Sequence, residues 1–476
     1  MNRDTIYSQF LNLEVKYNLF DLSVDDIQVW ERIRLNTFRQ ILYKCGIINE
    51  AHDDLKYTPQ TYLQALTTLV QSGIQTNPLL ANHHDFFFFG HPRRQVENDG
   101  YWWDIYCDPI YSEVDLNYVH MSANVKLNDY TPRKTTNYRN LDFVRILANV
   151  FRNTRSLEPN LPPDVCQTLQ SFSAELNDQL GVNVNLRQIV AEKLTERASL
   201  KPFYDRILDR VDPAVAVMVV SYENNTFIEA CHDQDIPVVE LQHGVINKYH
   251  LGYSYPEPRR KEVFPDYFFI WGKKWQEMAE LPLSSEAIIP VGYPYLEQQA
   301  SKIKNRDSEE TIIFISQGTI GEKLSQLAAE FANQNPTLDV VYKLHPGEYD
   351  RWETAYPWLT DAPVVVIDSN DPPLYELLTQ ASYQVGVYST ALYEGLFFGT
   401  ETYIADLYGA DRMEGLLQQG DATLVSTASE LTIAVESNTD VGDFDAMGYF
   451  EPNATDKIRT QLQQILSKRL QLGYEE

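Results

Sequence analysis

One stretch of the sequence, residues 238–246 (VVELQHGVI), constrains the fold more than any other. Val238, Val239 and Leu241 are apolar, which is typical of the end of a strand buried in a parallel sheet. Gln242, His243 and Gly244 follow where that strand would end. In open α/β sheets, ligands bind outside the carboxyl ends of the strands. His243 is therefore expected either at the mouth of a cleft, as a titratable group, or hydrogen-bonded to a neighbouring loop.

Short apolar runs recur along the first half of the chain and leave room for helices between them. The strands expected at 214–220 and 236–241 are separated by a short helix at 227–233, which together form a βαβ unit. A long helical region at 169–208 is expected to break near Gly181 and Pro202. The remaining strands expected in this half lie at 86–89, 117–121, 267–271 and 288–291.

The second half repeats the alternation of strand and helix. Strands are expected at 311–316, 339–344, 364–367, 383–388 and 402–405, with helices at 321–331, 373–380, 390–398 and 411–419. Strands that alternate with helices indicate parallel sheets covered by helices. With 476 residues the chain is too long for one core. The sequence therefore predicts two α/β domains, each with its own parallel sheet.

Charge and cysteine content exclude several classes of function. The chain carries a net charge of −28 at pH 7, and a protein that binds a nucleic-acid backbone needs a basic surface, so we expect no nucleic-acid partner. Its four cysteines form no CxxC pair, which favours free thiols in a reducing cytoplasm. No signal core and no bilayer-spanning apolar run is found. A cytoplasmic protein is expected, and any membrane contact would be peripheral, at the inner face.

A basic loop and an aromatic loop follow the first expected strand. Arg93 and Arg94 come directly after the strand at 86–89, and the segment 100–109 (GYWWDIYCDP) interleaves aromatic rings with Asp104 and Asp108. Flat rings stack on sugar faces, and carboxylates accept hydrogen bonds from sugar hydroxyls. These four residues are expected to bind an acceptor. The alternative is a surface loop whose rings pack on the N-terminal helices.

Two strand ends of the second half carry polar residues suited to a phosphate. Ser316, Gln317 and Thr319 surround a glycine just before an expected helix, a pattern typical of a loop whose amides bind phosphate. His345 ends the next strand and could donate a charge-assisted hydrogen bond to a phosphate oxygen.

After a third strand, a helix begins at Ser389 and Thr390. Their hydroxyls and free amides could form an anion site. Glu394 lies four residues after Thr390 on the same helix face and could accept the hydroxyls of a ribose. The alternative is that Ser389 only caps the helix and Glu394 is solvated.

Gln242-His243-Gly244, His345-Pro346 and Ser389-Thr390-x-x-x-Glu394 together resemble the GT-B glycosyltransferases of bacterial and archaeal surface polysaccharides. These include capsule-synthesis and polysialyltransferase-like enzymes and, more distantly, CDP-glycerol glycerophosphotransferases. The resemblance covers residues 210–410. It implies two Rossmann-like domains that face each other across a cleft, and it implies that the His-Pro and Ser-Thr pairs contact the donor phosphate. The aspartate base of the related sialyltransferases has no clear counterpart.

The resemblance also suggests a division of the chain. An N-terminal helical extension is expected at 1–80, an acceptor domain at 81–295 and a linker at 296–310. A nucleotide-donor domain at 311–453 and a C-terminal helix at 454–476 follow. The Asp-x-Asp triplets at 233–235 and 443–445 follow no expected strand, so no metal site is predicted.

We therefore expect a metal-independent glycosyltransferase that moves a sugar from a nucleotide-activated donor to a surface-glycan or lipid-linked acceptor, with no cofactor besides that substrate. His243 is the candidate base, and Glu223 is its candidate partner or substitute. Gln242 and Gly244 are assigned to the acceptor side. Glu240 is disfavoured as the partner, because alternation along a strand would point it away from His243.

Three alternatives share these residues. A CDP-alcohol transferase would use the same nucleotide site but would direct the attack at phosphorus. A nucleotide-sugar epimerase has the same fold. A non-catalytic, nucleotide-binding subunit of a polysaccharide-assembly complex belongs to a different functional class.

Overall fold

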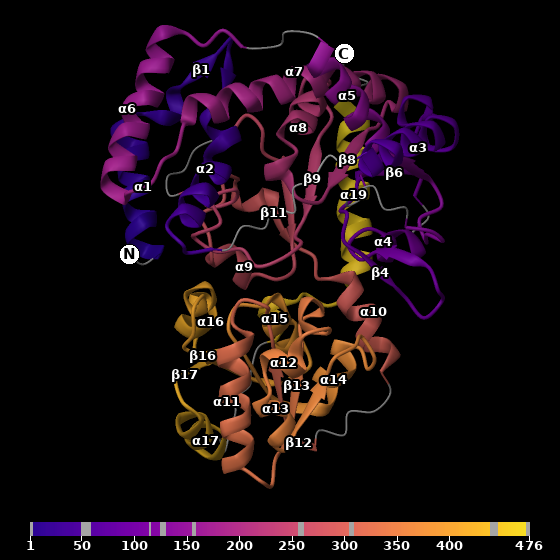
Figure 1. Cartoon of the computed structure of the whole chain (residues 1–476). Coiled ribbons are helices and arrows are strands. Elements are labelled where there is room, and N and C mark those ends of the chain that lie inside the picture. The colour runs from indigo at the N-terminus through magenta and orange to yellow at the C-terminus, as the bar shows by residue number, and fades with distance from the viewer. Residues whose placement is uncertain are drawn as a thin grey trace.

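The computed structural model describes residues 3–48, 59–113, 116–123, 130–154, 159–255, 261–303, 309–437 and 446–472. It consists of two α/β bodies stacked one above the other, each built on its own sheet (Figure 1). No sheet runs through both bodies in the described part of the chain.

The sheet of the N-terminal domain has seven strands, and every neighbouring pair is parallel. Chain order starts in the middle at β3, runs outward through β6 to β7, and then continues on the other side of β3 from β8 to β11, which is a doubly wound topology. All six predicted strands are present, and only the three-residue edge strand β7 was missed. The bounds are β3 (Phe86–Phe89), β6 (Tyr118–Ser122), β7 (Tyr138–Asn140), β8 (Val215–Met218), β9 (Val238–Leu241), β10 (Tyr267–Ile270) and β11 (Ile288–Pro290).

The sheet of the C-terminal domain has six parallel strands in the order β14-β13-β12-β15-β16-β17. The winding again reverses beside the first strand of the domain, between β12 and β15. All five predicted strands are present, and β17 was missed. The bounds are β12 (Glu309–Ile315), β13 (Asp339–Lys343), β14 (Val364–Ile367), β15 (Ala381–Gly386), β16 (Glu401–Ala405) and β17 (Thr423–Val425).

Helices cover both sheets. The helices that follow strands are α4 (Asp108–Glu113), α5 (Asp142–Thr154), α8 (Asn225–His232), α9 (Lys274–Glu277), α11 (Gly321–Gln334), α12 (Trp352–Ala355), α13 (Trp358–Asp361), α14 (Leu374–Gln380), α15 (Thr390–Phe397), α16 (Glu414–Gln419), α17 (Ala428–Ser437) and α18 (Ala446–Tyr449). The predicted break at Gly181 is confirmed, because α6 (Pro163–Leu180) ends there with a left-handed φ of 65°.

The predicted break at Pro202 is wrong, because α7 (Leu186–Val211) runs through it. Proline costs a helix one hydrogen bond. Burial on both sides of Pro202, at Leu194 before it and Tyr204 and Ile207 after it, holds the helix together.

The first 80 residues do not form one unit. Helices α1 (Arg3–Lys16) and α2 (Trp30–Lys44) pack with α6 and the first half of α7 around a separate hydrophobic core, whereas α3 (Pro59–Gln75) packs on α5. Within the first core, Arg34 is fully buried and donates through Nε to Glu14 Oε1 at 2.5 Å. Two short hairpin strands, β1 (Ser23–Val24) and β2 (Ile27–Gln28), join α1 to α2.

The chain passes between the domains twice. Helix α10 (Pro294–Lys302) covers the first part of the predicted linker, of which 304–308 lie outside the described residues. Helix α19 (Ala454–Leu472), yellow in Figure 1, returns to the N-terminal domain and packs on β8, α4 and α10. The return needs Gly292, whose φ is 94° and whose added Cβ would lie 2.2 Å from the carbonyl oxygen of Glu451.

Two Rossmann-like domains with parallel sheets, joined by a returning C-terminal helix, confirm the predicted GT-B architecture. Within the described ranges, none of the helices combines the length and the apolar character that a membrane crossing requires.

Candidate active site between the two domains

The strand ends of the two domains meet at the gap between the sheets. Two predicted residues approach each other there: a Cβ added at Gly244, just after β9, would lie 3.9 Å from Oγ1 of Thr390, at the start of α15. Asn247 Nδ2 donates to the carbonyl oxygen of Arg412 at 3.4 Å, and Lys248 Nζ lies 2.7 Å from Glu414 Oε2. The loop after β9 therefore lies against the C-terminal domain.

His243 lies at this junction inside a shell of aromatic side chains. Its Nε2 is 3.3 Å from the Tyr222 hydroxyl, and its Nδ1 is 3.3 Å from the Tyr253 hydroxyl. The His91 ring stacks on it at 6.0 Å between centroids, and Tyr106 donates to its backbone carbonyl at 2.9 Å. Burial, followed by the neighbouring His91, lowers the pKa of His243 well below its usual value. His243 is therefore neutral at pH 7 and has the lone pair that a base needs.

Glu223, the predicted acidic partner of His243, and Glu240, the one disfavoured, both lie differently from expectation. Glu223, in the turn after β8, points to Arg39 at 3.2 Å, and both side chains are largely exposed. Glu240 is fully buried in β9, and its Oε1 accepts from the Tyr253 hydroxyl at 2.5 Å. The residue set aside on strand alternation is thus connected to His243 through Tyr253.

Gln242 and Arg93 have distinct surroundings at the same edge. The buried amide of Gln242 accepts from Trp271 N–H at 2.8 Å and donates to the Gly244 carbonyl at 3.0 Å, so it holds the loop after β9 in place.

Arg93 is exposed and donates to the Tyr106 hydroxyl at 3.3 Å. Burial raises the pKa of Glu394, and the Arg93 guanidinium across the gap opposes that rise. Arg93 and Glu394, from opposite domains, are therefore close enough to interact electrostatically.

Arg94, Asp104 and Asp108 lie inside the N-terminal domain. Arg94 and Asp104 are cross-strand partners in a hairpin of β4 (Arg94–Val96) and β5 (Trp102–Asp104), with Nη1 2.6 Å from Oδ2. Asp108 accepts from the Thr135 hydroxyl at 2.6 Å and from Asp104 N–H at 2.6 Å. Both carboxylates are buried and paired. We therefore correct the acceptor-side assignment of these three residues to an internal polar network.

His120 completes this network. Its Nε2 lies 3.2 Å from Arg94 Nη2, and burial together with that guanidinium lowers its pKa to about 3. Burial acts to raise the pKa of Asp104, but Arg94 and His120 outweigh it and hold the pKa below its ordinary value. Asp104, Cys107 and His120 are the only described His, Cys, Asp or Glu side chains spaced closely enough to hold a metal ion. Arg94 already supplies a positive charge there.

The loop after β12 is the first predicted donor segment. Ser316 is buried and bonded to the Tyr342 hydroxyl at 3.0 Å. Gln317 donates to the Tyr388 carbonyl at 3.4 Å, while the exposed Thr319 hydroxyl contacts the Tyr388 hydroxyl. The loop is thus tied to the end of β15, across the point where the winding of the sheet reverses.

His345 is exposed at the end of β13 and held in one orientation. Gly347 N–H donates to its Nδ1 at 3.1 Å, and its own N–H donates to Glu348 Oε2 at 2.8 Å. Because Nδ1 is an acceptor, the neutral ring carries its proton on Nε2. Among the described residues, none is hydrogen-bonded to that Nε2. The ring can therefore donate to a ligand.

Ser389 is the N-cap of α15 and accepts from Ala391 N–H at 3.2 Å, so the capping role considered from the sequence is present. Ser389 and Thr390 are half-buried beside Gly244. Glu394 is buried rather than solvated and hydrogen-bonds Tyr375. The start of α15 therefore points its helix dipole into the gap.

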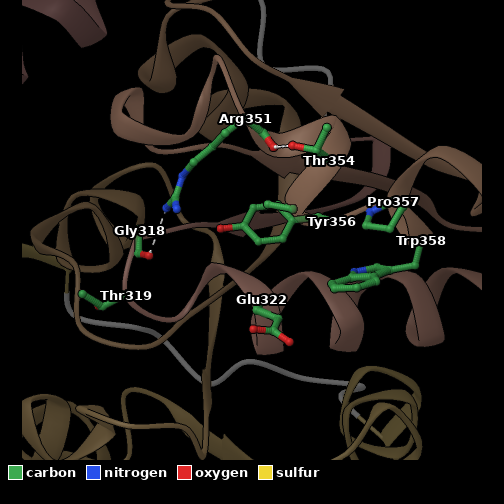
Figure 2. Close-up of a pocket in the computed structure, with 9 residues that line it drawn as sticks. Gly318, Thr319, Glu322, Arg351, Thr354, Tyr356, Pro357 and Trp358 are labelled. Carbon is green, nitrogen blue, oxygen red and sulfur yellow. Dashed lines mark hydrogen bonds between the residues drawn. The ribbon is translucent and has the colours of Figure 1, made fainter.

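A cavity of about 510 Å³ adjoins the β12 loop on the side of α11 and α12 (Figure 2). Gly318 and Thr319 form one wall, and the Arg351 guanidinium reaches the Gly318 carbonyl at 3.4 Å. Tyr356 and Trp358 close the other side. The cavity gives the predicted phosphate loop an arginine neighbour that the sequence did not suggest.

Several residues of the site were not predicted. Tyr253, His91 and Arg351 lie 10, 152 and 108 residues from His243 along the chain, and no local pattern marks them. Tyr222 lies in the turn four residues after the end of β8, and this position was the available signal.

No family model and no curated protein matches the chain. Several solved structures match the chain. The UDP-GlcNAc 2-epimerase from Neisseria meningitidis bound to UDP-GlcNAc is 13% identical, with a TM-score of 0.46, over 80% of this chain and 99% of that one. The wall teichoic acid polymerase TagF is 10% identical, with a TM-score of 0.42, over 87% and 99%. The spinosyn rhamnosyltransferase SpnG is 14% identical, with a TM-score of 0.39, over 82% and 95%. These values are too low to transfer an activity.

Proposed function

We propose that this protein is a glycosyltransferase that moves a sugar from a nucleotide-activated donor to a surface-glycan or lipid-linked acceptor. The C-terminal domain would hold the nucleotide, and the N-terminal domain would hold the acceptor. The transfer would run without a metal ion, because the chain itself offers positive and dipolar groups to the leaving phosphate.

The observation that carries this proposal is the meeting of two unlike groups across the gap. A neutral, half-buried histidine just after β9 lies one residue from Gly244, which faces the N-terminus of α15. Glycosyl transfer needs this pairing: a base for the acceptor hydroxyl on one side, and an anion-stabilising group for the leaving phosphate on the other.

The proposed chemistry assigns each side chain a step. The acceptor hydroxyl gives its proton to His243 and its oxygen forms a bond to the anomeric carbon. The bond from that carbon to the donor phosphate breaks, and its electron pair leaves with the nucleotide. The Nε2–H of His345 and the first-turn amides of α15 would stabilise the negative charge that develops on the phosphate. Arg93, which faces the gap, would neutralise part of the same charge.

Binding and transfer can be tested in one series. Nucleotide-sugars are first screened by thermal unfolding, where a ligand at about a hundred times its dissociation constant adds about 2.7 kcal/mol of stability. Labelled UDP-sugars, CMP-sugars and CDP-glycerol are then incubated with glycan and lipid-linked acceptors, and the products are identified. His243→Ala should lower turnover by roughly a hundredfold with little change in nucleotide affinity.

Three outcomes would contradict the proposal. A product with an inverted sugar stereocentre and no new glycosidic bond would indicate an epimerase. Transfer of glycerol phosphate would indicate a CDP-alcohol transferase. Nucleotide binding with neither transfer nor hydrolysis would indicate a non-catalytic subunit.

A further inference from the structure

We propose that Glu240 and Tyr253 form a positioning pair that fixes His243 in the tautomer whose Nε2 is unprotonated. The inference rests on the proposed function, because the pair would prepare His243 to act as the base. Its physical content, the tautomer, can be measured without any substrate.

The pair is a continuous chain of short contacts inside the N-terminal domain. Oε1 of Glu240 accepts from the backbone N–H of Ser221 at 3.0 Å and lies 2.5 Å from the Tyr253 hydroxyl oxygen. The same hydroxyl oxygen lies 3.3 Å from His243 Nδ1. Glu240 is fully buried and Tyr253 is 1% exposed, so water does not compete for these groups.

The direction of the chain follows from what each atom can do. A backbone N–H only donates, so Oε1 of Glu240 is an acceptor, and a proton on this carboxyl would occupy Oε2, which has no hydrogen-bond partner among the described residues. The Tyr253 O–H therefore donates to Oε1 whether or not Glu240 is ionised. With its only proton committed, the Tyr253 oxygen accepts, and His243 Nδ1 must be the donor.

A proton on Nδ1 leaves Nε2 bare. Nε2 contacts the Tyr222 hydroxyl at 3.3 Å, where an acceptor hydroxyl could replace that contact and transfer its proton. In the step proposed above, the acceptor proton moves to Nε2, the ring becomes imidazolium, and its Nδ1–H still donates to Tyr253. The proton later leaves Nε2 for solvent, which restores the starting tautomer.

The surroundings show why a positioning pair matters. Burial and the neighbouring groups His91, His250, Arg93 and Arg39 all lower the pKa of His243 and so oppose the imidazolium form. Tyr106 donates to its backbone carbonyl and packs edge-on against its ring. Glu240 is the carboxyl connected to the ring through hydrogen bonds, and burial raises its own pKa to about 7. Once ionised, it would favour the positive ring through Tyr253.

The direct test is nitrogen NMR on the intact protein labelled with ¹⁵N-histidine. The chain has nine histidines, and the His243 signals are assigned by their loss in His243→Asn. Wild-type His243 should show a protonated Nδ1 and a bare Nε2. Tyr253→Phe should shift His243 towards the other tautomer. Tyr255→Phe is the matched control, because its hydroxyl is buried without a hydrogen-bond partner among the described residues and is two positions away.

Kinetics give the second readout. Tyr253→Phe should lower turnover by roughly 10–100-fold, as when the partner that orients a metal-bound histidine is lost, with KM for the nucleotide-sugar unchanged. Glu240→Gln keeps the Oε1 acceptor but cannot ionise, so it should keep the tautomer and lower turnover less. Tyr255→Phe should match the wild type. If Glu240→Gln does not fold, Tyr253→Phe alone decides.

A protonated Nε2 in the wild type, or a Tyr253→Phe protein with unchanged His243 signals, would overturn the inference. Failure of the proposed function is a separate result. In that case no transfer is found with any donor, while the tautomer is still read from the NMR signals.

Discussion

The two edges that meet at the gap are built in opposite ways. The polar groups behind the N-terminal edge are buried and hydrogen-bonded within the domain: Asp104, His120 and Glu240 are all fully buried. At the C-terminal edge, Thr319 and His345 are exposed, and Ser389 and Thr390 are half-buried. At the N-terminal edge the polar groups are already hydrogen-bonded within the protein. At the C-terminal edge, hydrogen-bond donors remain available to a ligand.

The difference suggests a division of labour. Buried, paired groups are costly to desolvate but hold an orientation without reorganisation, which suits a base that must be aligned before its substrate arrives. Exposed donors on a helix start and a capped turn cost little and remain available to an anion. We therefore expect changes at the N-terminal edge to affect folding and turnover, and changes at the C-terminal edge to affect nucleotide affinity.

The largest expected effect is the loss of Arg94. Arg94→Met leaves the buried carboxylate of Asp104 without its 2.6 Å partner, and breaking a buried pair costs roughly 3–5 kcal/mol. Urea unfolding should show that loss. Arg93→Met is the matched control, since Arg93 is exposed and should change the unfolding free energy by less than about 1 kcal/mol. Equal costs for the two variants would show that the N-terminal network is not internal.

The second-largest expected effect is the pH dependence that Glu240 gives to the free energy of unfolding. Burial raises its folded-state pKa to about 7, above its ordinary value of 4.5. Between these two values the unfolded chain has lost the proton and the folded protein still holds it, so the free energy of unfolding falls as pH rises, by about 1.4 kcal/mol for each pH unit of that interval. Glu240→Gln cannot ionise and should lack this fall. Urea midpoints of the two proteins at pH 5, 6, 7 and 8 should therefore diverge up to about pH 7, and parallel curves would contradict the raised pKa.

Substitutions at the C-terminal edge should lower nucleotide affinity instead. His345→Ala and Ser389→Ala each remove a group proposed to contact phosphate, worth roughly 1.5–3 kcal/mol if the contact is charge-assisted. Calorimetry with the nucleotide found in the screen should show that loss.

Ser389→Ala also removes a helix cap, and Asn185→Ala is its matched control. Asn185 caps α7 by accepting from Gln188 N–H at 3.2 Å, away from the gap. Both variants should lose about 1 kcal/mol of stability, but only Ser389→Ala should lose nucleotide affinity. Unchanged affinity in both His345→Ala and Ser389→Ala would mean that the C-terminal edge holds no nucleotide phosphate.

The sequence predicted the strands well, because a buried parallel strand is a continuous apolar run that needs no partner to be recognised. In the two parallel sheets it missed β7 and β17, edge strands of three residues each. His243, His345 and Ser389 do follow the carboxyl ends of β9, β13 and β15, as the sequence predicted.

The internal network could not be predicted in the same way. Arg94 and Asp104 become partners only through the register of the β4–β5 hairpin, whose strands show no alternation. Their proximity to aromatic residues suggested a sugar site, although that pattern does not distinguish a buried network from an exposed one. Tyr253 reaches His243 through the fold of the loop after β9, and nothing in the local sequence encodes that contact.

The smallest expected effect lies where the two edges meet. The described backbone has no left-handed φ at Gly244, and a Cβ there would lie at an ordinary contact distance of 3.9 Å from Thr390 Oγ1. Gly244→Ala should therefore change the unfolding free energy by less than about 1 kcal/mol, and should change turnover and nucleotide affinity by less than about threefold. Gly292→Ala provides the contrast, because its Cβ would lie 2.2 Å from the Glu451 carbonyl oxygen at a φ of 94°. A loss of several kcal/mol in Gly244→Ala would mean that the edges are packed against each other, which would leave no room for the donor and the acceptor between them.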